Sequence, residues 1–355
     1  MFKKKTITAI LSIAMAAASF TGCSSNNTSS DNYAVKATVP SPAASKSYNI
    51  VCTIFPEYDW TKEILGSHAD NAEISYLLES GTDLHNYQPT ADDIVKISTC
   101  DLFIYVGGES DEWTEDAIAN AKNPDMKVIS LMDVLGDSAK AEELKEGMQE
   151  SEHDHEEGEE DHDEHEEEEH DHEEGEVEYD EHVWLSLKNA KVLCAEIEKN
   201  IEAIDPANAA DYKANLDSYT SKLDELDNSF RTLVDSASVK TLVFGDRFPF
   251  RYFVDDYGLD YFAAFIGCSA ESEASFETIK FLADKINELD CNTVFTLENS
   301  SKDIANAVIS NSGKDGVKIA ELNSLQSVSQ ADIANGVSYI SLMQKNYDVL
   351  SNTLE

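Results

Sequence analysis

Six of the nine histidines in this 355-residue chain lie in one tract, residues 151–181, where they are surrounded by carboxylates. The tract carries 20 acidic residues and no Lys or Arg. Because it offers little apolar surface and its like charges repel one another, it does not fold alone. Imidazole nitrogens and carboxylate oxygens are ligands of divalent cations, so the tract indicates a loop that attracts metal ions rather than a plain acidic linker. Its histidines are His153, His155, His162, His165, His170 and His172.

His182 closes the tract and differs from the other six, because an apolar sequence at 183–185 follows it directly. Such a histidine can be held rigidly by a fold. A further histidine, His85, lies in the loop 83–90, just after a predicted strand at 73–78. In parallel α/β sheets ligands bind beyond the carboxyl ends of the strands, which places His85 at the expected binding edge. Taken alone, His85 would more simply be a surface histidine in a loop.

The composition limits the classes of partner. The net charge is −44, and 41% of the residues are hydrophobic, which is compatible with sizeable cores in a chain long enough for two domains. Nucleic acid is not expected as a partner, since phosphate binding requires clustered basic residues. The negative electrostatic field of so acidic a chain favours a cation or a neutral ligand.

The N-terminus has the pattern of a targeting segment. Lysines at 3–5 precede an apolar stretch at 7–20 that is too short to span a membrane. The stretch ends before Cys23 in a sequence that resembles a bacterial lipoprotein signal, so we expect removal of residues 1–22 and lipid on Cys23; ordinary secretion is the alternative. Residues 23–47 would form a flexible tether. The protein is therefore expected at the outer face of the cytoplasmic membrane, on a cell surface or in a periplasm.

Export permits disulfides, and five cysteines remain besides Cys23. Cys52 and Cys100 lie on neighbouring predicted strands and could pair. Cys268 and Cys291 flank one strand–helix unit of the second half and could form a second bridge, although sequence does not fix connectivity. Cys194 lies on a helical pattern and is expected to be a small buried residue.

Strand and helix patterns alternate through residues 48–208, apart from a loop at 141–181 that contains the tract. Short apolar runs predict strands at 48–54, 73–78, 101–106 and 127–131. Strands interleaved with helices indicate a parallel sheet covered on both faces. We therefore expect residues 48–208 to form an N-terminal α/β lobe.

Residues 209–237 carry the clearest helical pattern, with apolar residues that step by four and three. A helix of this length spans roughly 40 Å, which suits an element that joins two lobes; a coiled-coil dimer seam is the alternative. Residues 238–355 repeat the alternation of strand and helix, with strands expected at 239–244, 260–265, 291–297 and 317–322. The predicted fold class is α/β: two lobes, each with a parallel sheet flanked by helices, joined by one long connecting helix, with a metal cleft between the lobes.

Several motifs together resemble one family. They are the loop 83–90, the His-rich acidic insertion with His182 directly after it, the long helix, and the aromatic pair Tyr252-Phe253. This combination, which covers nearly the whole chain after the targeting segment, is similar to the metal-specific solute-binding lipoproteins of bacterial ABC importers for zinc or manganese. The resemblance implies that His85 and His182 are two metal ligands, both in the N-terminal lobe.

The family takes a third ligand from the second lobe, usually a His or a Glu shortly before the aromatic pair, and this chain departs from the pattern there. Arg247 occupies the matching position, and a guanidinium that stays protonated cannot bind a cation. Asp246, one residue earlier, is the expected substitute, while Glu298 and a histidine of the tract are the alternatives. The occasional fourth carboxylate of the family is not evident, and Glu321 is the nearest acid.

Two neutral imidazoles and a carboxylate form a zinc-type site, whereas manganese (Mn2+) prefers more oxygen ligands than Zn2+ does. By the resemblance, the expected function is high-affinity capture of zinc outside the cytoplasm by a monomeric, lipid-anchored protein that delivers the ion to an ABC permease. A manganese-binding protein of the same type, or a surface adhesin or metal-buffering lipoprotein, is the alternative. A metalloenzyme is the rival class, but no His or Glu is placed as a base near His85, so no enzymatic activity is expected.

Overall fold

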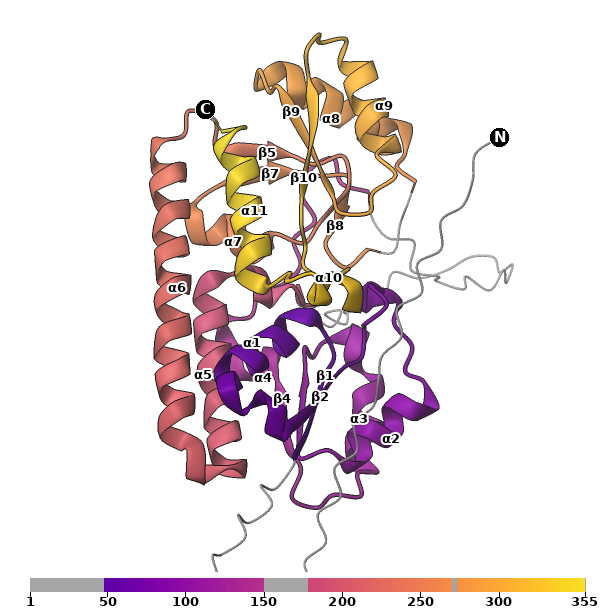
Figure 1. Ribbon diagram of the computed structural model, residues 1–355. Helices are drawn as coiled ribbons and strands as arrows, with labels where there is room; N and C mark the ends of the chain where they lie inside the picture. Colours follow the sequence, from indigo (N-terminus) through magenta and orange to yellow (C-terminus); the bar gives the residue numbers. More distant parts are fainter. Residues whose placement is uncertain (1–47, 150–177, 270–272, 355) are drawn as a thin grey trace, which may run out of the picture. The chain divides into compact units, whose positions relative to one another are not determined.

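The computed structural model describes residues 48–149, 178–269 and 273–354, which belong to one compact unit (Figure 1). We call residues 48–149 and 178–208 the N-terminal lobe, and residues 238–269 and 273–354 the C-terminal lobe. Cys23 and the six histidines of the tract lie outside the described residues.

The N-terminal lobe is built on a four-stranded parallel sheet in the order β2-β1-β3-β4. Strands β1 and β3 are almost wholly buried, because their runs of apolar residues suit a sheet that helices cover on both faces. The sheet predicted for this half is therefore confirmed. Its strands are β1 (Tyr48–Cys52), β2 (Ala72–Tyr76), β3 (Leu102–Tyr105) and β4 (Lys127–Ser130), and its helices are α1 (Phe55–Leu65), α2 (Ala91–Thr99), α3 (Trp113–Ala119), α4 (Leu131–Leu135) and α5 (Leu187–Ile204).

The C-terminal lobe contains a second set of parallel strands. Strand β5 pairs with β7, and β9 pairs with β10, while a parallel bridge between Phe244 and Phe295 connects the two pairs. Strands β6 and β8 form a further short parallel pair. The strands are β5 (Thr241–Val243), β6 (Arg247–Phe248), β7 (Asp260–Phe262), β8 (Phe265–Ile266), β9 (Thr293–Leu297) and β10 (Lys318–Leu322), and the helices are α7 (Arg251–Tyr257), α8 (Phe276–Glu288), α9 (Asp303–Ser312), α10 (Gln330–Ala334) and α11 (Tyr339–Ser351).

One long helix, α6 (Ala209–Ser236), joins the lobes and ends one residue earlier than predicted. Its buried stripe, which includes Tyr212, Leu223 and Phe230, packs against α1 and α5 of the N-terminal lobe and against α7 and α11 of the C-terminal lobe (Figure 1). Because helices of the same chain cover this stripe, it is not available as the seam of a coiled-coil dimer. Helix α6 is therefore the connecting element that the sequence predicts.

The C-terminal segment also returns to the N-terminal lobe. The hydroxyl of Tyr76 donates to the carbonyl of Val328 at 3.0 Å, and Ser80 and Ser329 form an antiparallel bridge. Helix α11 packs against α1 as well as against α6 and β10. The lobes are thus joined both by α6 and by the loop and helices that close the chain.

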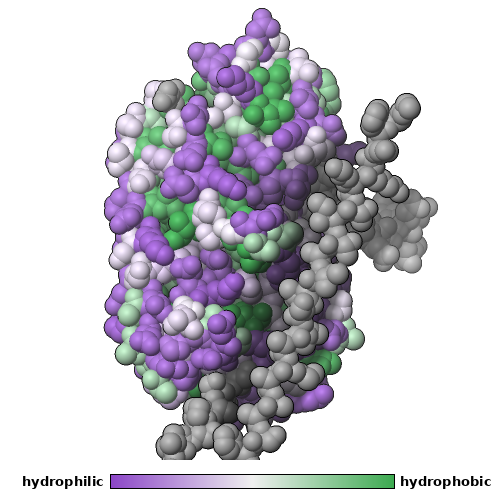
Figure 2. All heavy atoms as spheres, viewed as in Figure 1, coloured by the Kyte–Doolittle hydropathy of each residue, from purple (hydrophilic) through white to green (hydrophobic). Residues whose placement is uncertain are grey.

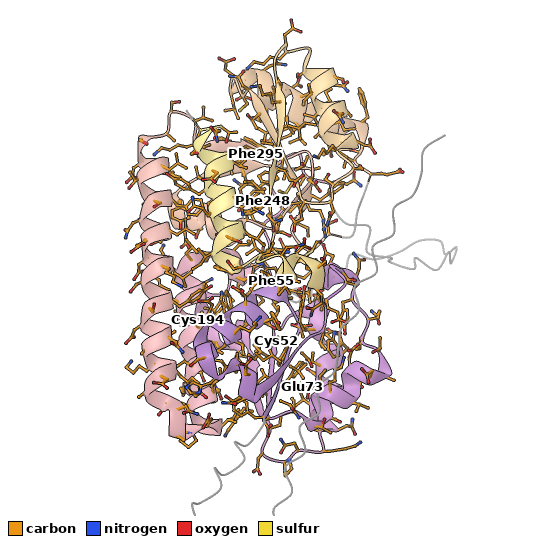
Figure 3. All side chains as sticks on the ribbon, viewed as in Figure 1. Cys52, Phe55, Glu73, Cys194, Phe248 and Phe295 are labelled. Carbon is orange, nitrogen blue, oxygen red and sulfur yellow. The ribbon has the colours of Figure 1, made fainter. Side chains whose placement is uncertain are left out.

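None of the five described cysteines forms a disulfide, so both predicted pairs are wrong. Cys52 is the last residue of β1, whereas the register of β1 and β3 places Cys100 beside the first residues of β1. Cys291 precedes β9 and Cys268 follows β8, and the two thiols lie in different surroundings. Cys194 is buried on α5, as predicted (Figure 3).

The fold takes up both ends of the predicted loop 141–181, so the expectation for these ends was wrong. Ala141 and Tyr179 form an antiparallel bridge. Asp180 is 0% exposed and Glu181 is 2% exposed, despite their place in an acidic tract. Asp180 and Glu181 are acidic like the rest of the tract, but the backbone N–H of Asp180 donates to the carbonyl of Lys140. Their carboxylates accept hydrogen bonds inside the fold, from His182 and from Ser110.

None of the helices in the described part of the chain is both long enough and apolar enough to cross a membrane. On the face in Figure 2, hydrophobic residues lie in small groups separated by hydrophilic ones. The exposed large hydrophobic residues come from separate elements and are Val95, Val128, Leu144, Tyr179, Val192 and Phe276.

Phe230 anchors α6 to the C-terminal lobe. The centroid of its ring lies 5.0 Å from that of Phe253, 5.3 Å from that of Tyr257 and 5.4 Å from that of Tyr347. Phe230→Ala leaves a cavity among these rings, so we expect the free energy of unfolding to fall by about 3–5 kcal/mol. Chemical denaturation measures the loss. Asn228→Ala, at an exposed position of the same helix, should change stability little, and an equal loss in both variants would contradict the assignment.

Asp59 on α1 should give the protein a pH-dependent stability. It accepts a hydrogen bond from the backbone N–H of Tyr339 at 2.9 Å, and burial raises its pKa from 3.8 to about 7. The folded state therefore binds the proton of the Asp59 carboxyl more tightly than the unfolded state does. The stability gained from this proton is fully present below about pH 3.8 and is lost as the pH rises to about 7.

Asp59→Asn cannot titrate, so its free energy of unfolding should fall less steeply between pH 4 and pH 7 than that of the native chain. Urea denaturation at several pH values measures both slopes. Asp125→Asn, at an exposed position, is the control and should keep the native slope. Parallel curves for the native chain and Asp59→Asn would refute the prediction.

Candidate metal centre

His85 lies at the carboxyl end of the N-terminal sheet, in a single 3-10 turn, Leu84–Asn86, that follows β2. The side chain of Asp83 caps this turn by accepting the backbone N–H of His85 at 3.1 Å. On the ring, Nδ1 lies 2.8 Å from the hydroxyl oxygen of Ser110 and 3.5 Å from Oε2 of Glu181. These contacts fix the ring plane and leave Nε2 pointing away from them.

His182 begins a second 3-10 turn, Val183–Leu185, which leads into α5. Its side chain is fully buried, and one oxygen of Asp180 accepts both the backbone N–H at 2.8 Å and the ring Nδ1–H at 3.0 Å. The hydroxyl of Tyr252 donates to the carbonyl of Asp180 at 2.8 Å. Tyr252 of the C-terminal lobe therefore holds the backbone that orients His182.

The two imidazoles converge at Nε2. Their Nε2 atoms lie 3.2 Å apart, although the residues are 97 positions apart in the chain. With the ring protons on Nδ1, beside the hydroxyl of Ser110 and the carboxylate of Asp180, both Nε2 lone pairs face the same point. Two nitrogens bound at 2.0–2.1 Å to one tetrahedral metal ion would lie about 3.3 Å apart. The spacing of His85 and His182 therefore matches that of two ligands of one ion.

Burial keeps both imidazoles neutral. It lowers the pKa of His182 to about 4, and burial together with the neighbouring His182 lowers the pKa of His85. A metal ion binds only the neutral ring, so neither histidine must lose a proton at neutral pH before it can bind.

Cys268 approaches the two histidines from the C-terminal lobe. Its Sγ and one ring nitrogen of each histidine all lie within 4.8 Å of one another. Its backbone N–H donates to Oε1 of Glu142 at 3.2 Å, and burial raises the pKa of its thiol well above its usual range. His85, Glu142, Glu181 and Cys268 share the wall of a pocket of about 240 Å³.

The backbone comes close to this cluster at two glycines. At Gly108, where φ is +90°, a Cβ would lie 2.5 Å from Oε1 of Glu181, so another residue type would be both strained and in collision. At Gly267 a Cβ would lie 3.1 Å from two atoms of the His182 ring, which is a tight contact. The chain that carries Cys268 thus passes close to the His182 ring.

Arg247, at the position where the resembled family carries its third ligand, acts as a clamp between the lobes. Its guanidinium donates to Oδ2 of Asp83 at 2.6 Å and to the carbonyl of Ser269 at 3.2 Å. It therefore links the turn that carries His85 to the loop that carries Cys268.

The structure does not bring Asp246 or Glu298 into the cluster. Oδ2 of Asp246 accepts the backbone N–H of Leu297 at 3.1 Å, so this carboxylate is turned toward β9. Both oxygens of Glu298 accept from Ser324, at 2.7 Å from its N–H and at 2.6 Å from its hydroxyl. In turn, the carbonyl of Ser324 accepts the indole N–H of Trp184 at 2.8 Å. Both carboxylates therefore serve the C-terminal lobe as hydrogen-bond acceptors.

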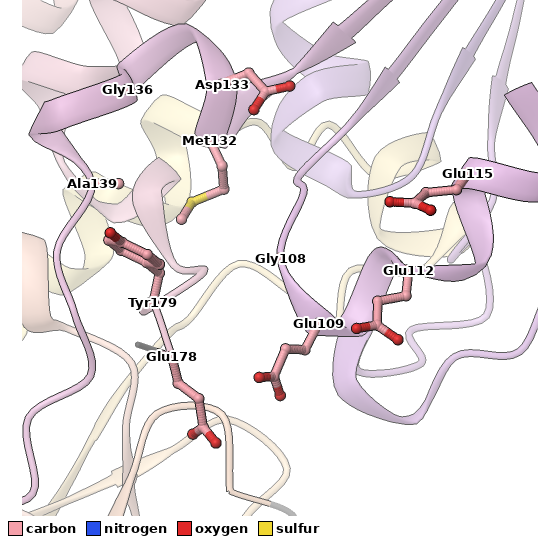
Figure 4. Close-up of a pocket in the computed structure, with 10 residues that line it drawn as sticks. All are labelled: Gly108, Glu109, Glu112, Glu115, Met132, Asp133, Gly136, Ala139, Glu178 and Tyr179. Atoms are coloured by element: carbon pink, nitrogen blue, oxygen red, sulfur yellow. The ribbon is translucent and has the colours of Figure 1, made fainter. Parts of the chain in front are cut away.

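A wider acidic pocket adjoins the cluster. It has a volume of about 530 Å³ and shares Glu109, Glu178 and Tyr179 with the smaller pocket. Figure 4 shows the carboxylates of Glu109 and Glu178 on either side of its opening, with Glu112 and Glu115 on the neighbouring wall. The approach to the imidazoles is therefore lined with negative charge.

Sequence reasoning found the two histidines but missed their supports. Asp180 and Glu181 were assigned to the loose tract, and Cys268 was assigned to a disulfide. In the sequence, the role of Asp180 and Glu181 is indicated by their position directly before His182, where a carboxylate can reach the ring. The signal for Cys268 is the neighbouring Gly267, which permits close approach of the backbone, but the sequence does not reveal what it approaches.

Two α/β lobes with convergent imidazoles near their junction define a metal-binding protein of the solute-binding type. The model of one family, zinc-uptake complex component A, periplasmic, matches residues 50–353. The chain belongs to this family.

The chain is similar to the zinc-binding lipoprotein AdcA of Streptococcus pneumoniae, with 30% identity over 307 residues, which cover 86% of this chain and 56% of that protein. It thus spans about half the length of the curated relatives that match it first. The high-affinity zinc uptake system protein ZnuA of Bacillus subtilis is 29% identical over 306 residues, which cover 86% of this chain and 87% of the relative.

Solved structures support the fold. The Zn(II)-bound ZnuA-like domain of Streptococcus pneumoniae AdcA matches with a TM-score of 0.64 and 28% identity, covering 87% of this chain and 99% of that one. The laminin-binding adhesin Lmb of Streptococcus agalactiae matches with a TM-score of 0.68 at 22% identity, covering 87% of this chain and 100% of that one, and this likeness concerns the fold alone. The α/β prediction with two lobes is confirmed.

Asp180→Asn tests how His182 is oriented. The variant keeps the size of the side chain but removes the charge that fixes the ring proton on Nδ1. We expect the affinity for a divalent transition metal ion to fall by about 10- to 100-fold, as measured by competition with a chromogenic chelator. Asp137→Asn, at an exposed carboxylate in another 3-10 turn, should bind like the native chain. Unchanged affinity in Asp180→Asn would remove Asp180 from the centre.

Proposed function

We infer that this protein captures zinc outside the cytoplasm and delivers it to an ABC-type permease. The observation that carries the inference is the pair of buried imidazoles whose Nε2 atoms converge at 3.2 Å. Membership of the zinc-uptake family supports the same assignment. His85 and His182 are the two proposed zinc ligands, and the negative pocket beside them favours entry of a cation.

Zinc fits this centre better than manganese. Neutral imidazole is a preferred ligand of zinc, whereas manganese prefers carboxylate, carbonyl and water oxygens. The carboxylates closest to the histidines, Asp180 and Glu181, face the Nδ1 side of the rings, where they accept or balance ring protons. The donor atoms at the point of convergence are therefore nitrogen, which favours zinc.

The function proposed is binding and release, without a chemical step on the ion. The ion would bind where the two lobes meet, and the contacts between them would hold the closed form that a permease recognises. The family description names a component of a zinc-uptake complex, which supports a membrane permease as the partner. On the basis of its targeting segment, we propose that the protein lies outside the cytoplasm and is lipid-anchored through Cys23. We further propose that it acts as a monomer.

The central prediction concerns stoichiometry and the role of the tract. Replacement of residues 150–177 by a short Gly/Ser linker keeps Tyr179, Asp180 and Glu181 in the fold. This variant should bind one zinc ion tightly per chain, and manganese should not displace it. In the same background, His85→Ala and His182→Ala should each abolish tight binding, as measured by competition with a fluorescent zinc chelator.

His68→Ala is the matched control. His68 pairs with Asp211 at 2.9 Å, outside the metal-binding cluster, so its removal should leave zinc affinity unchanged. Loss of tight binding on replacement of the tract alone would show that the tract supplies an essential ligand. Turnover of a hydrolysable substrate by the zinc-loaded protein would contradict a transport role.

A further inference from the structure

We propose that the thiol of Cys268 is the third zinc ligand and completes a centre with two imidazoles and one thiolate. This inference rests on the proposed function and adds the identity of the ligand from the C-terminal lobe. Its basis is the position of Sγ within 4.8 Å of the ring nitrogens of His85 and His182. Among the residues that the structure describes, this is the one such group of His, Cys, Asp and Glu side chains.

The other described side chains considered for this role are engaged elsewhere, while the histidines of the tract lie outside the described residues. Arg247 carries a permanent positive charge and donates to Asp83. Asp246 accepts from the backbone of β9, and Glu298 accepts twice from Ser324. Glu181 lies on the Nδ1 side of His85, opposite the point where the Nε2 atoms meet. Cys268 is therefore the donor from the C-terminal lobe that faces the convergent nitrogens.

The loop that carries Cys268 is held against the histidines on two sides. Arg247 donates to the carbonyl of Ser269, the next residue, while its other nitrogen binds Asp83 beside His85. On the opposite side, Gly267 lies so close to the His182 ring that a Cβ would be 3.1 Å from it. The arginine that replaces the expected ligand thus fixes the position of a different one.

The distances suit zinc with a small adjustment. With zinc–nitrogen bonds of 2.0–2.1 Å and a zinc–sulfur bond of about 2.3 Å, a tetrahedral ion places nitrogen and sulfur about 3.6 Å apart. Sγ lies within 4.8 Å of the nitrogens, so a shift of about 1 Å, or a change of the thiol rotamer, would bring it into the coordination shell.

Binding would exchange one bond for another. The S–H bond of Cys268 breaks, the sulfur forms a bond to zinc, and the proton passes to the neighbouring carboxylate of Glu142 or to water. No oxidant or reductant takes part. A thiolate ligand would strengthen the preference for zinc over manganese, because soft sulfur is a poor ligand for manganese.

Cobalt(II) tests the ligand directly, because a cobalt–thiolate bond gives an intense near-ultraviolet charge-transfer band that imidazoles and carboxylates do not give. The mature chain is titrated with one equivalent of cobalt, together with Cys268→Ala and, as the matched control, Cys291→Ala, whose cysteine is buried in the small core of the C-terminal lobe. We expect the band in the native chain and in Cys291→Ala, and its absence in Cys268→Ala. Zinc affinity of Cys268→Ala should fall by at least about 100-fold.

Alkylation of the native chain covers the case in which Cys268→Ala fails to fold. Peptide mapping after iodoacetamide treatment should show that zinc protects Cys268 and that manganese does not. A native chain that binds zinc tightly, yet gives no thiolate band and no protection of Cys268, would overturn this inference and leave the proposed function intact. A native chain that binds no zinc would instead overturn the proposed function.

Discussion

Two neutral imidazoles whose lone pairs point at one another from 3.2 Å impose the main constraint on this molecule. With both ring protons on Nδ1, the two Nε2 lone pairs repel each other unless a cation lies between them, and neighbouring contacts must hold the rings in place. Asp180 fixes His182 through its ring and backbone nitrogens, and Ser110 faces Nδ1 of His85. Tyr252 of the C-terminal lobe in turn holds Asp180. The centre is therefore preorganised by both lobes before an ion arrives, and less of the binding free energy is lost in ordering the ligands.

Arg247 shapes the electrostatics of the junction as well as its geometry. A guanidinium close to a divalent cation repels it, and this cost must be balanced by negative charge. Asp83 pairs with Arg247 directly, and the nearby arginine also opposes protonation of both histidines. The local balance of charge favours an anionic ligand from the C-terminal lobe over a neutral imidazole, and this agrees with the position of Cys268.

The sequence was sufficient for the features that depend on periodicity. Alternating apolar runs located the four strands of the N-terminal sheet and β5, β7, β9 and β10 of the C-terminal lobe, but not the short strands β6 and β8. The stripe from Tyr212 to Phe230 located α6 within one residue. The sequence also singled out His85 and His182, each next to a predicted element end, and the structure brings the two rings together. It could not provide the contacts that arise when distant segments meet. The approach of Cys268 depends on how the two lobes pack, and the burial of Asp180 depends on a backbone bridge inside an acidic tract.

The acidic residues of this chain fall into two physical roles, and burial separates them. Asp180 and Glu181 are buried at the centre and work through defined hydrogen bonds to His182 and Ser110. Glu109 and Glu178 are exposed at the mouth of the acidic pocket, where carboxylates stay hydrated and raise the local concentration of cations without fixing their position. Glu178 and Tyr179, at the C-terminal end of the tract, line this pocket. Attraction of a cation to the exposed carboxylates can therefore be weak, rapid and dependent on salt. The affinity for the bound ion would depend instead on the few buried donor atoms. Attraction and affinity can then change independently of one another.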